Sequence, residues 1–285
     1  MRAAPPSEVR FPGHGGEPVA GHLARPAGAR PAPAVVLVHG IGGFDDHIRA
    51  VARRFAEEGF AALAPDLGER DRGRGFPQGT GDPAAPREPV AAPPDARIAG
   101  DLAGAARYLS TLPGVRRGAV GAVGFGAGGT WAFHLACERT APIKACVDFY
   151  GPLRRDPATP EKPKGNLDRV HELCCPLLGI FGAKDELIPL ADVLALKEAL
   201  GGRGAVIAYP RAGHGFHDDT RPSYREEEAK DAWRRAILFL RERMAPDTLP
   251  PDALPAVPDC RPPAGGGGKR RGGGGPWKGR RGRPS

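Results

Sequence analysis

The chain has 285 residues, of which 40% are hydrophobic and 26% charged, as is usual for a protein with a buried core. Its formal net charge of +8 comes from residues 261–285, which contain eight basic side chains and no acidic ones. The rest of the chain has 33 basic and 33 acidic side chains, so the charge gives no reason to expect that the folded part binds nucleic acid.

We expect neither a leader nor a membrane span, and the cysteines show no metal-binding pattern. The first seven residues lack an apolar stretch, and no apolar run approaches the roughly 20 residues that span a bilayer. The five cysteines have no metal-ligand spacing, and Cys174 and Cys175 are adjacent. We expect a cytoplasmic protein with free thiols, without metal or organic cofactor and without a membrane partner.

Strands and helices alternate along the predicted chain. Two short strands, 8–11 and 18–23, flank a turn-rich connection and predict a hairpin. The apolar run 34–38 predicts a strand buried on both faces, and Asp45 or Asp46 can cap the helix 47–58. The later elements are strand 60–64, a surface loop from 66 to about 94, helix 96–112, strand 119–123, helix 130–138, strands 143–149 and 177–181, helix 191–200, strand 205–209 and helix 223–243.

This alternation predicts an α/β fold with a mostly parallel central sheet flanked by helices. We assign residues 1–245 to that single domain. Residues 246–285 are rich in Pro, Gly and Arg, so we expect a disordered basic tail. Weak non-specific nucleic-acid binding by residues 261–285 is the alternative to a merely solvated tail, and we do not favour it because Trp277 is the tail's only aromatic residue.

Four turns follow predicted strands, where an open α/β sheet gathers its reactive groups. The first is the glycine-rich His39-Gly-Ile-Gly-Gly, and the second is Gly124-Phe-Gly-Ala-Gly-Gly between a strand and a helix. Asp185 follows a third strand and His214 a fourth. The order elbow, acid, histidine is the chain order of the α/β-hydrolase triad, in which the elbow carries the nucleophile.

The second turn also fits a dinucleotide fingerprint, in which Gly124, Gly126 and Gly129 would cradle a pyrophosphate. Asp148, 19 residues after Gly129, would then bind a ribose. Against this interpretation, the motif lies behind two α/β units and the other three turns have no role. Dinucleotide binding stays open as an alternative at this point.

The stretches VLVHGIGG, HIRAVARRFAEEGFAALAPDL, GAVGFGAGG, GAKDELIP and GHGF resemble the dienelactone hydrolase (carboxymethylenebutenolidase) family. The similarity covers about residues 9–243. It implies an α/β-hydrolase that opens lactones or cleaves small esters through an acyl-enzyme on a Cys-His-Asp triad. By resemblance, Asp185 orients His214 as general base, and the backbone N–H groups of Ile41 and Ala127 form the oxyanion hole.

Three positions depart from the family pattern. The nucleophilic cysteine corresponds to Gly126, its glutamate partner to Gly40 and a substrate-binding arginine to Asp218. Two interpretations follow: a weak hydrolase in which His214 and Asp185 activate water, or a non-catalytic ligand-binding protein. We do not expect a substitute nucleophile: Cys137 lies about 16 Å along a helix from Gly126, and Thr130 would have to point back to the sheet edge. The remaining candidates are expected to pack the fold, namely Cys146, Cys174, Cys175, His134, Trp131 and Trp233.

Overall fold

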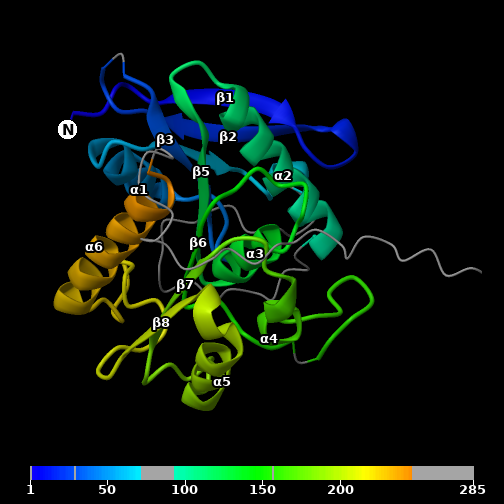
Figure 1. The fold of residues 1–285 in the computed structure, drawn as a ribbon, viewed down its shortest axis with the longest axis vertical. Coiled ribbons are helices and arrows are strands. Elements are labelled where there is room, and N and C mark those ends of the chain that lie inside the picture. Colours follow the sequence, from blue (N-terminus) through cyan, green and yellow to red (C-terminus); the bar gives the residue numbers. More distant parts are fainter. Residues whose placement is uncertain (1, 29, 72–92, 156, 246–285) are drawn as a thin grey trace, which may run out of the picture.

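The computed structural model describes residues 2–28, 30–71, 93–155 and 157–245. Their strands form one eight-stranded sheet (Figure 1). Its strands in chain order are β1 (Ser7–Pro12), β2 (Pro18–Ala24), β3 (Ala32–Val38), β4 (Ala61–Pro65), β5 (Val115–Phe125), β6 (Cys146–Phe149), β7 (Leu177–Gly182) and β8 (Gly204–Tyr209). The spatial order is β1-β2-β4-β3-β5-β6-β7-β8. Strands β3 to β8 are parallel, whereas β2 is antiparallel to both β1 and β4. The predicted hairpin and the mostly parallel sheet are confirmed.

Helices cover both faces of this sheet. They are α1 (Asp46–Glu57), α2 (Asp95–Thr111), α3 (Ala127–Ala136), α4 (Asn166–Arg169), α5 (Leu190–Leu200) and α6 (Glu226–Arg243). Figure 1 shows α1 and α6 on one side and α2 and α3 on the other. None of the helices in the described residues is long and apolar enough to cross a membrane.

The central strands are buried because helices cover both of their faces. Every residue of β4 is buried, and Val35, Val36 and Val38 in β3 have no exposed surface. β-branched side chains favour this extended, doubly covered environment. The first helix begins as predicted, since the Asp45 side chain accepts a hydrogen bond from the Ile48 backbone N–H at 3.0 Å.

Strand β3 pairs with β4 on one side and with β5 on the other. The chain therefore continues from β3 to β4 on one side of it, and later returns across β3 to form β5 on the other side. This reversal creates a crevice beyond the carboxyl ends of the two strands, where α/β proteins place their ligands. The turns at residues 39–43 and 124–129, which we predicted to be functional, follow β3 and β5.

Several local predictions need correction. Strand β6 begins at Cys146 and not at residue 143, and α6 begins at Glu226 and not at residue 223. Helix α3 begins at Ala127 and not at residue 130, because Gly128 and Gly129 belong to its first turn despite their low helix propensity. The predicted surface loop contains a short 3₁₀ helix, Glu69–Asp71, in which Arg70 pairs with the buried Asp101. Residues 72–92 of that loop lie outside the described residues, as does the tail 246–285.

A buried histidine lies behind the crevice. His217 is 1% exposed, and its ring packs against Phe125, Phe149 and Trp233 at centroid distances of 5.1–5.8 Å. Neither ring nitrogen has a hydrogen-bond partner among the described residues. Burial disfavours the charged imidazolium and lowers the pKa of His217 to about 3.

This pKa predicts an acid-sensitive fold. Between about pH 3 and pH 6.5 the unfolded chain binds a proton that folded His217 does not, so stability falls as pH falls, by about 1.4 kcal/mol per pH unit. The variant His217→Phe keeps an aromatic ring and cannot titrate. Urea unfolding at a series of pH values should give a shallower pH slope for the variant, and equal slopes would contradict the assignment.

Candidate active site

Asp185 and His214, which come from two separate turns, form a hydrogen-bonded pair. The distance from His214 Nδ1 to Asp185 Oδ2 is 2.9 Å. The other carboxylate oxygen accepts from the backbone N–H groups of Leu187 and Ile188 at 2.9 and 3.1 Å, and the Asp185 side chain is fully buried. A carboxylate held in this way accepts from Nδ1–H, which leaves Nε2 of His214 free to accept a proton.

Gly126 occupies the sharp turn between β5 and α3. Its backbone angles, φ 57° and ψ −127°, lie in a region that side-chain-bearing residues rarely adopt. The neighbouring glycines are required by close packing, since a Cβ on Gly124 would lie 1.9 Å from the Gly128 carbonyl oxygen. A Cβ on Gly128 would lie 2.3 Å from the Val38 carbonyl oxygen. The turn therefore has the geometry of a nucleophile elbow without a nucleophile.

The same turn faces the histidine across a cavity of about 240 Å³. A Cβ built on Gly126 would have one neighbour among the described residues within 4 Å, the Nε2 atom of His214 at 3.8 Å. The residues around the cavity come from the ends of the strands and from α1: Gly40, Ile41, Gly42, Gly43, Asp45, His47, Ile48, Phe125, Gly126, Ala127, Tyr150, Leu187, His214, Gly215, Asp218 and Arg221. The structure thus brings all five predicted site residues to one place, since Asp185 lies directly behind His214.

The predicted oxyanion-hole residues, Ile41 and Ala127, both line this cavity. Ala127 is the first residue of α3, so its N–H has no partner within the helix, and the positive end of the helix dipole adds to it. The loop that carries Ile41 is fixed by the buried His39, which contacts the Gly40 carbonyl oxygen through Nδ1 at 2.8 Å and the Leu67 N–H through Nε2 at 3.3 Å. Burial lowers the pKa of His39, which favours a neutral ring that can make both contacts.

Asp218, where the family pattern has arginine, lies in an ion-pair network at the cavity wall. Its Oδ2 accepts from Arg221 Nε at 2.6 Å, and its Oδ1 accepts from Thr220 N and Oγ1. His47 Nδ1 on α1 lies 3.3 Å from the same Oδ1. Burial favours the neutral acid, but His47 and these hydrogen bonds outweigh it, so the pKa of Asp218 is below its ordinary value.

His47, Asp218 and Asp219 place one potential ligand atom each within 4.8 Å of the others, which raises the question of a metal ion. Both carboxylate oxygens of Asp218 already accept hydrogen bonds, one of them from the cationic Arg221. A bound cation would have to displace these donors and approach a fixed positive charge. We therefore interpret the cluster as an ion-pair network that joins α1 to the loop that carries His214.

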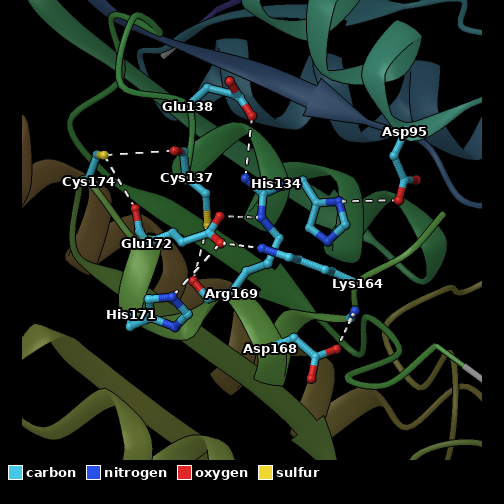
Figure 2. Close-up of polar contacts among 11 residues, drawn as sticks. Asp95, His134, Cys137, Glu138, Lys164, Asp168, Arg169, His171, Glu172 and Cys174 are labelled. Carbon is cyan, nitrogen blue, oxygen red and sulfur yellow. Dashed lines mark hydrogen bonds and ion pairs between the residues drawn. The ribbon is translucent and has the colours of Figure 1, made fainter. Parts of the chain in front are cut away.

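Neither Thr130 nor Cys137 is placed to act as a nucleophile beside His214. Thr130 is 1% exposed and its hydroxyl donates to the Pro152 carbonyl oxygen at 2.8 Å. Cys137 follows α3, about 16 Å along the helix from Gly126 at the usual rise. Figure 2 shows it in a polar cluster of α3 and the α4 segment, and its Sγ lies 3.6 Å from the Arg169 carbonyl oxygen. Burial raises the pKa of the Cys137 thiol to about 12, so it carries almost no thiolate near neutral pH.

The other three described cysteines are not in disulfides. Cys146 is fully buried in β6, and burial raises the pKa of its thiol. Cys175 is buried, and Cys174, visible in Figure 2, lies 3.4 Å from the Glu172 carbonyl oxygen. The predicted packing role agrees with the burial of Cys146, Cys175, Trp131, His134 and Trp233, whereas Cys174 is only partly buried.

The dinucleotide interpretation fails on Asp148. This side chain has no exposed surface and accepts hydrogen bonds from Gly151 N and Asn166 Nδ2 at 2.8 and 3.1 Å. Burial raises the pKa of Asp148 to about 7. A Cβ on Gly129 would lie 2.1 Å from Asp148 Oδ1, so this glycine accommodates the buried carboxyl. Asp148 is therefore not available to a ribose.

Sequence reasoning missed Tyr150 and Arg221, which both line the cavity. Tyr150 has φ 43°, the one positive φ among described non-glycine residues, and its ring packs edge-on to His214 at 5.3 Å. A strained backbone of this kind often marks a functional site, but the local sequence does not predict a positive φ at Tyr150. Arg221, seven residues after His214, could have been found only by testing each nearby arginine for a carboxylate partner.

Comparison with known proteins gives a consistent family. Residues 19–244 match the model of the dienelactone hydrolase family. A putative carboxymethylenebutenolidase of Methylorubrum extorquens is 36% identical over 243 residues, which cover 82% of this chain and 80% of that protein. One of the same description from Escherichia coli is 35% identical over 217 residues, covering 74% and 78% of the two chains.

A solved structure supports the same grouping. The crystal structure of a putative dienelactone hydrolase from Klebsiella pneumoniae superimposes with a TM-score of 0.75 at 31% sequence identity. The match covers 85% of this chain and all of the other. The sheet and helices described above are therefore those of an α/β-hydrolase, as the sequence motifs predicted.

The geometry of the elbow predicts opposite outcomes for two neighbouring glycines. In Gly126→Ala the methyl group has room, so the cost is the backbone strain of about 1–3 kcal/mol. In Gly128→Ala the methyl group overlaps the carbonyl oxygens of Val38 and His39, so we expect a loss above about 4 kcal/mol or no folded protein. Urea unfolding of both variants measures this difference, and equal losses would show that the turn is built differently.

Proposed function

The chain belongs to the dienelactone hydrolase family of small-ester and lactone hydrolases, and from this premise we propose that it hydrolyses such substrates in one step, with water as the nucleophile. The observation that carries the proposal is the pairing of an intact His214–Asp185 dyad with a glycine at the elbow. The base and the donors for charge stabilisation are present, whereas position 126 has no side chain that could form an acyl-enzyme.

In this mechanism a water molecule takes the place above Gly126. His214 Nε2 faces that place, since it lies 3.8 Å from where a Cβ would stand. The imidazole accepts a proton from the water as the water oxygen attacks the substrate carbonyl carbon. Asp185 stabilises the imidazolium that forms, because its carboxylate accepts from Nδ1 and is held by two backbone N–H groups.

The tetrahedral intermediate places its negative charge on the former carbonyl oxygen. The N–H groups of Ile41 and Ala127 are the donors for that oxygen, and the α3 N-terminus favours the charge. When the intermediate collapses, the leaving alkoxide takes the proton from His214, and the free acid and the alcohol are released. The step forgoes covalent catalysis, so we expect slow turnover.

The cavity suggests a small substrate without a strong charge. Its volume of about 240 Å³ is below the range of about 300–1,000 Å³ that is usual for drug-sized ligands. The charge of Arg221 is balanced by Asp218, to which it is bonded. Without an uncompensated arginine at this wall, a neutral ester or lactone fits better than an anionic one.

Variants that remove either member of the His214–Asp185 pair test its role in hydrolysis. His214→Ala should lower the rate of p-nitrophenyl acetate hydrolysis by about 10²- to 10⁴-fold, the usual contribution of a general base. Asp185→Asn should also lose activity, because an asparagine amide does not stabilise the imidazolium. The matched control is His171→Ala, since the His171 side chain is 71% exposed and is not among the residues that line the cavity. Equal rates for wild type and His214→Ala would contradict the role of the dyad.

The one-step mechanism makes a separate prediction about covalent intermediates. Mass spectrometry after rapid mixing with p-nitrophenyl acetate should find no acetyl group at the elbow of the wild type. The Gly126→Cys variant should carry one, because its side chain points at His214 Nε2.

The double variant Gly126→Cys/His214→Ala is the control and should not be acetylated at position 126. If the wild type releases no p-nitrophenol while Gly126→Cys does, the chain is a ligand-binding member of the family and our proposal is wrong. An acyl group found on another cavity side chain of the wild type would also contradict it.

A further inference from the structure

The space above Gly126 is larger than one water molecule needs. Apart from the two residues adjacent in the chain, a Cβ at this position would have no described neighbour within 4 Å except His214 Nε2, and Gly40, which also lines the cavity, lacks a side chain too. Ile41, Phe125 and Tyr150 line the same cavity, and its charged lining residues Asp218 and Arg221 are bonded to each other. No side chain from positions 40 or 126 therefore fills the space beside the general base.

We propose that this space is an acceptor subsite for a small uncharged alcohol or thiol, so that the chain transfers acyl groups to such acceptors as well as to water. The inference rests on the proposed function, since both reactions use His214 as base. It extends that function from hydrolysis to direct ester exchange. The acceptor is a diffusible compound and takes the role of the missing nucleophilic side chain.

The reaction balances without a cofactor. The acceptor O–H or S–H gives its proton to His214 Nε2 while its oxygen or sulfur forms a bond to the acyl carbon. The carbonyl oxygen carries the negative charge between the N–H groups of Ile41 and Ala127. The bond from the acyl carbon to the leaving oxygen then breaks, and that oxygen takes the proton from His214. The products are a new ester or thioester and the released alcohol.

The glycine changes the kinetic mechanism that is expected for such a transfer. An elbow nucleophile would be acylated first and would release the leaving alcohol before an acceptor reacts, which gives ping-pong kinetics. With Gly126, donor and acceptor must occupy the cavity together, which gives sequential kinetics. A cavity volume of about 240 Å³ favours acceptors of the size of ethanol or ethanethiol beside a short acyl group.

The experiment uses the full chain, p-nitrophenyl acetate as donor and ethanol as acceptor, with ethanethiol as a second acceptor and tert-butanol as a bulky control. We expect a saturable, several-fold rise in p-nitrophenol release with ethanol, intersecting double-reciprocal lines, and ethyl acetate as product. Tert-butanol should give neither the rise nor an ester. His214→Ala should abolish the effect of ethanol, and Gly126→Ala should abolish its saturation, because the methyl group stands in the subsite.

The outcomes separate this inference from the proposed function. If the wild type hydrolyses p-nitrophenyl acetate to acetate but ethanol changes neither the rate of p-nitrophenol release nor the product, the acceptor subsite does not exist. The proposed hydrolysis would still hold. Parallel double-reciprocal lines, or saturation by ethanol that persists in Gly126→Ala, would also overturn the subsite. If the wild type turns over neither with water nor with ethanol, both proposals fail.

Discussion

The strand-to-helix turn at Gly126 is the constraint on which the site depends. Its positive φ turns the chain from β5 into α3 within one residue, and it directs any side chain at this position to His214. The turn closes only because Gly124 and Gly128 let backbone atoms approach at distances that a Cβ would forbid. The same packing sets the N–H of Ala127 at the start of α3, beside the loop of Ile41. One backbone conformation therefore sets both the place that faces His214 and the position of the Ala127 N–H.

This arrangement separates two requirements that a covalent hydrolase combines. The scaffold needs the strained elbow for the position of the oxyanion donors, whereas the chemistry needs a side chain there only if an acyl-enzyme forms. Glycine meets the first requirement at lower strain than any other residue. The buried Asp185 carboxylate and its two backbone donors keep His214 oriented all the same. In the mechanism that we propose, preorganised acid–base and electrostatic groups act without covalent catalysis.

Much of the fold and the core of the site could be predicted because both leave local marks. Runs such as 34–38 predict buried strands, and chain order places Asp185 and His214 at strand ends. The role of Asp148 could not be predicted, because it depends on whether the side chain is buried. The spacing after Gly129 is the same for a carboxylate that binds a ribose and for one that is enclosed by Gly151 and Asn166. Tyr150 and the Asp218–Arg221 pair could not be predicted, since positive φ and a particular ion-pair partner depend on tertiary packing. The start of α3 was misplaced because close packing overrides the low helix propensity of glycine.

The most direct test of the central claim is a crystal structure with a small alkylphosphonate, whose tetrahedral anion imitates the intermediate of one-step hydrolysis. Our account predicts a non-covalent ligand above Gly126. One phosphonate oxygen should accept from the N–H groups of Ile41 and Ala127, and a second should lie within hydrogen-bond distance of His214 Nε2. A phosphonate bound away from His214, or covalently attached to another side chain of the cavity, would contradict the account.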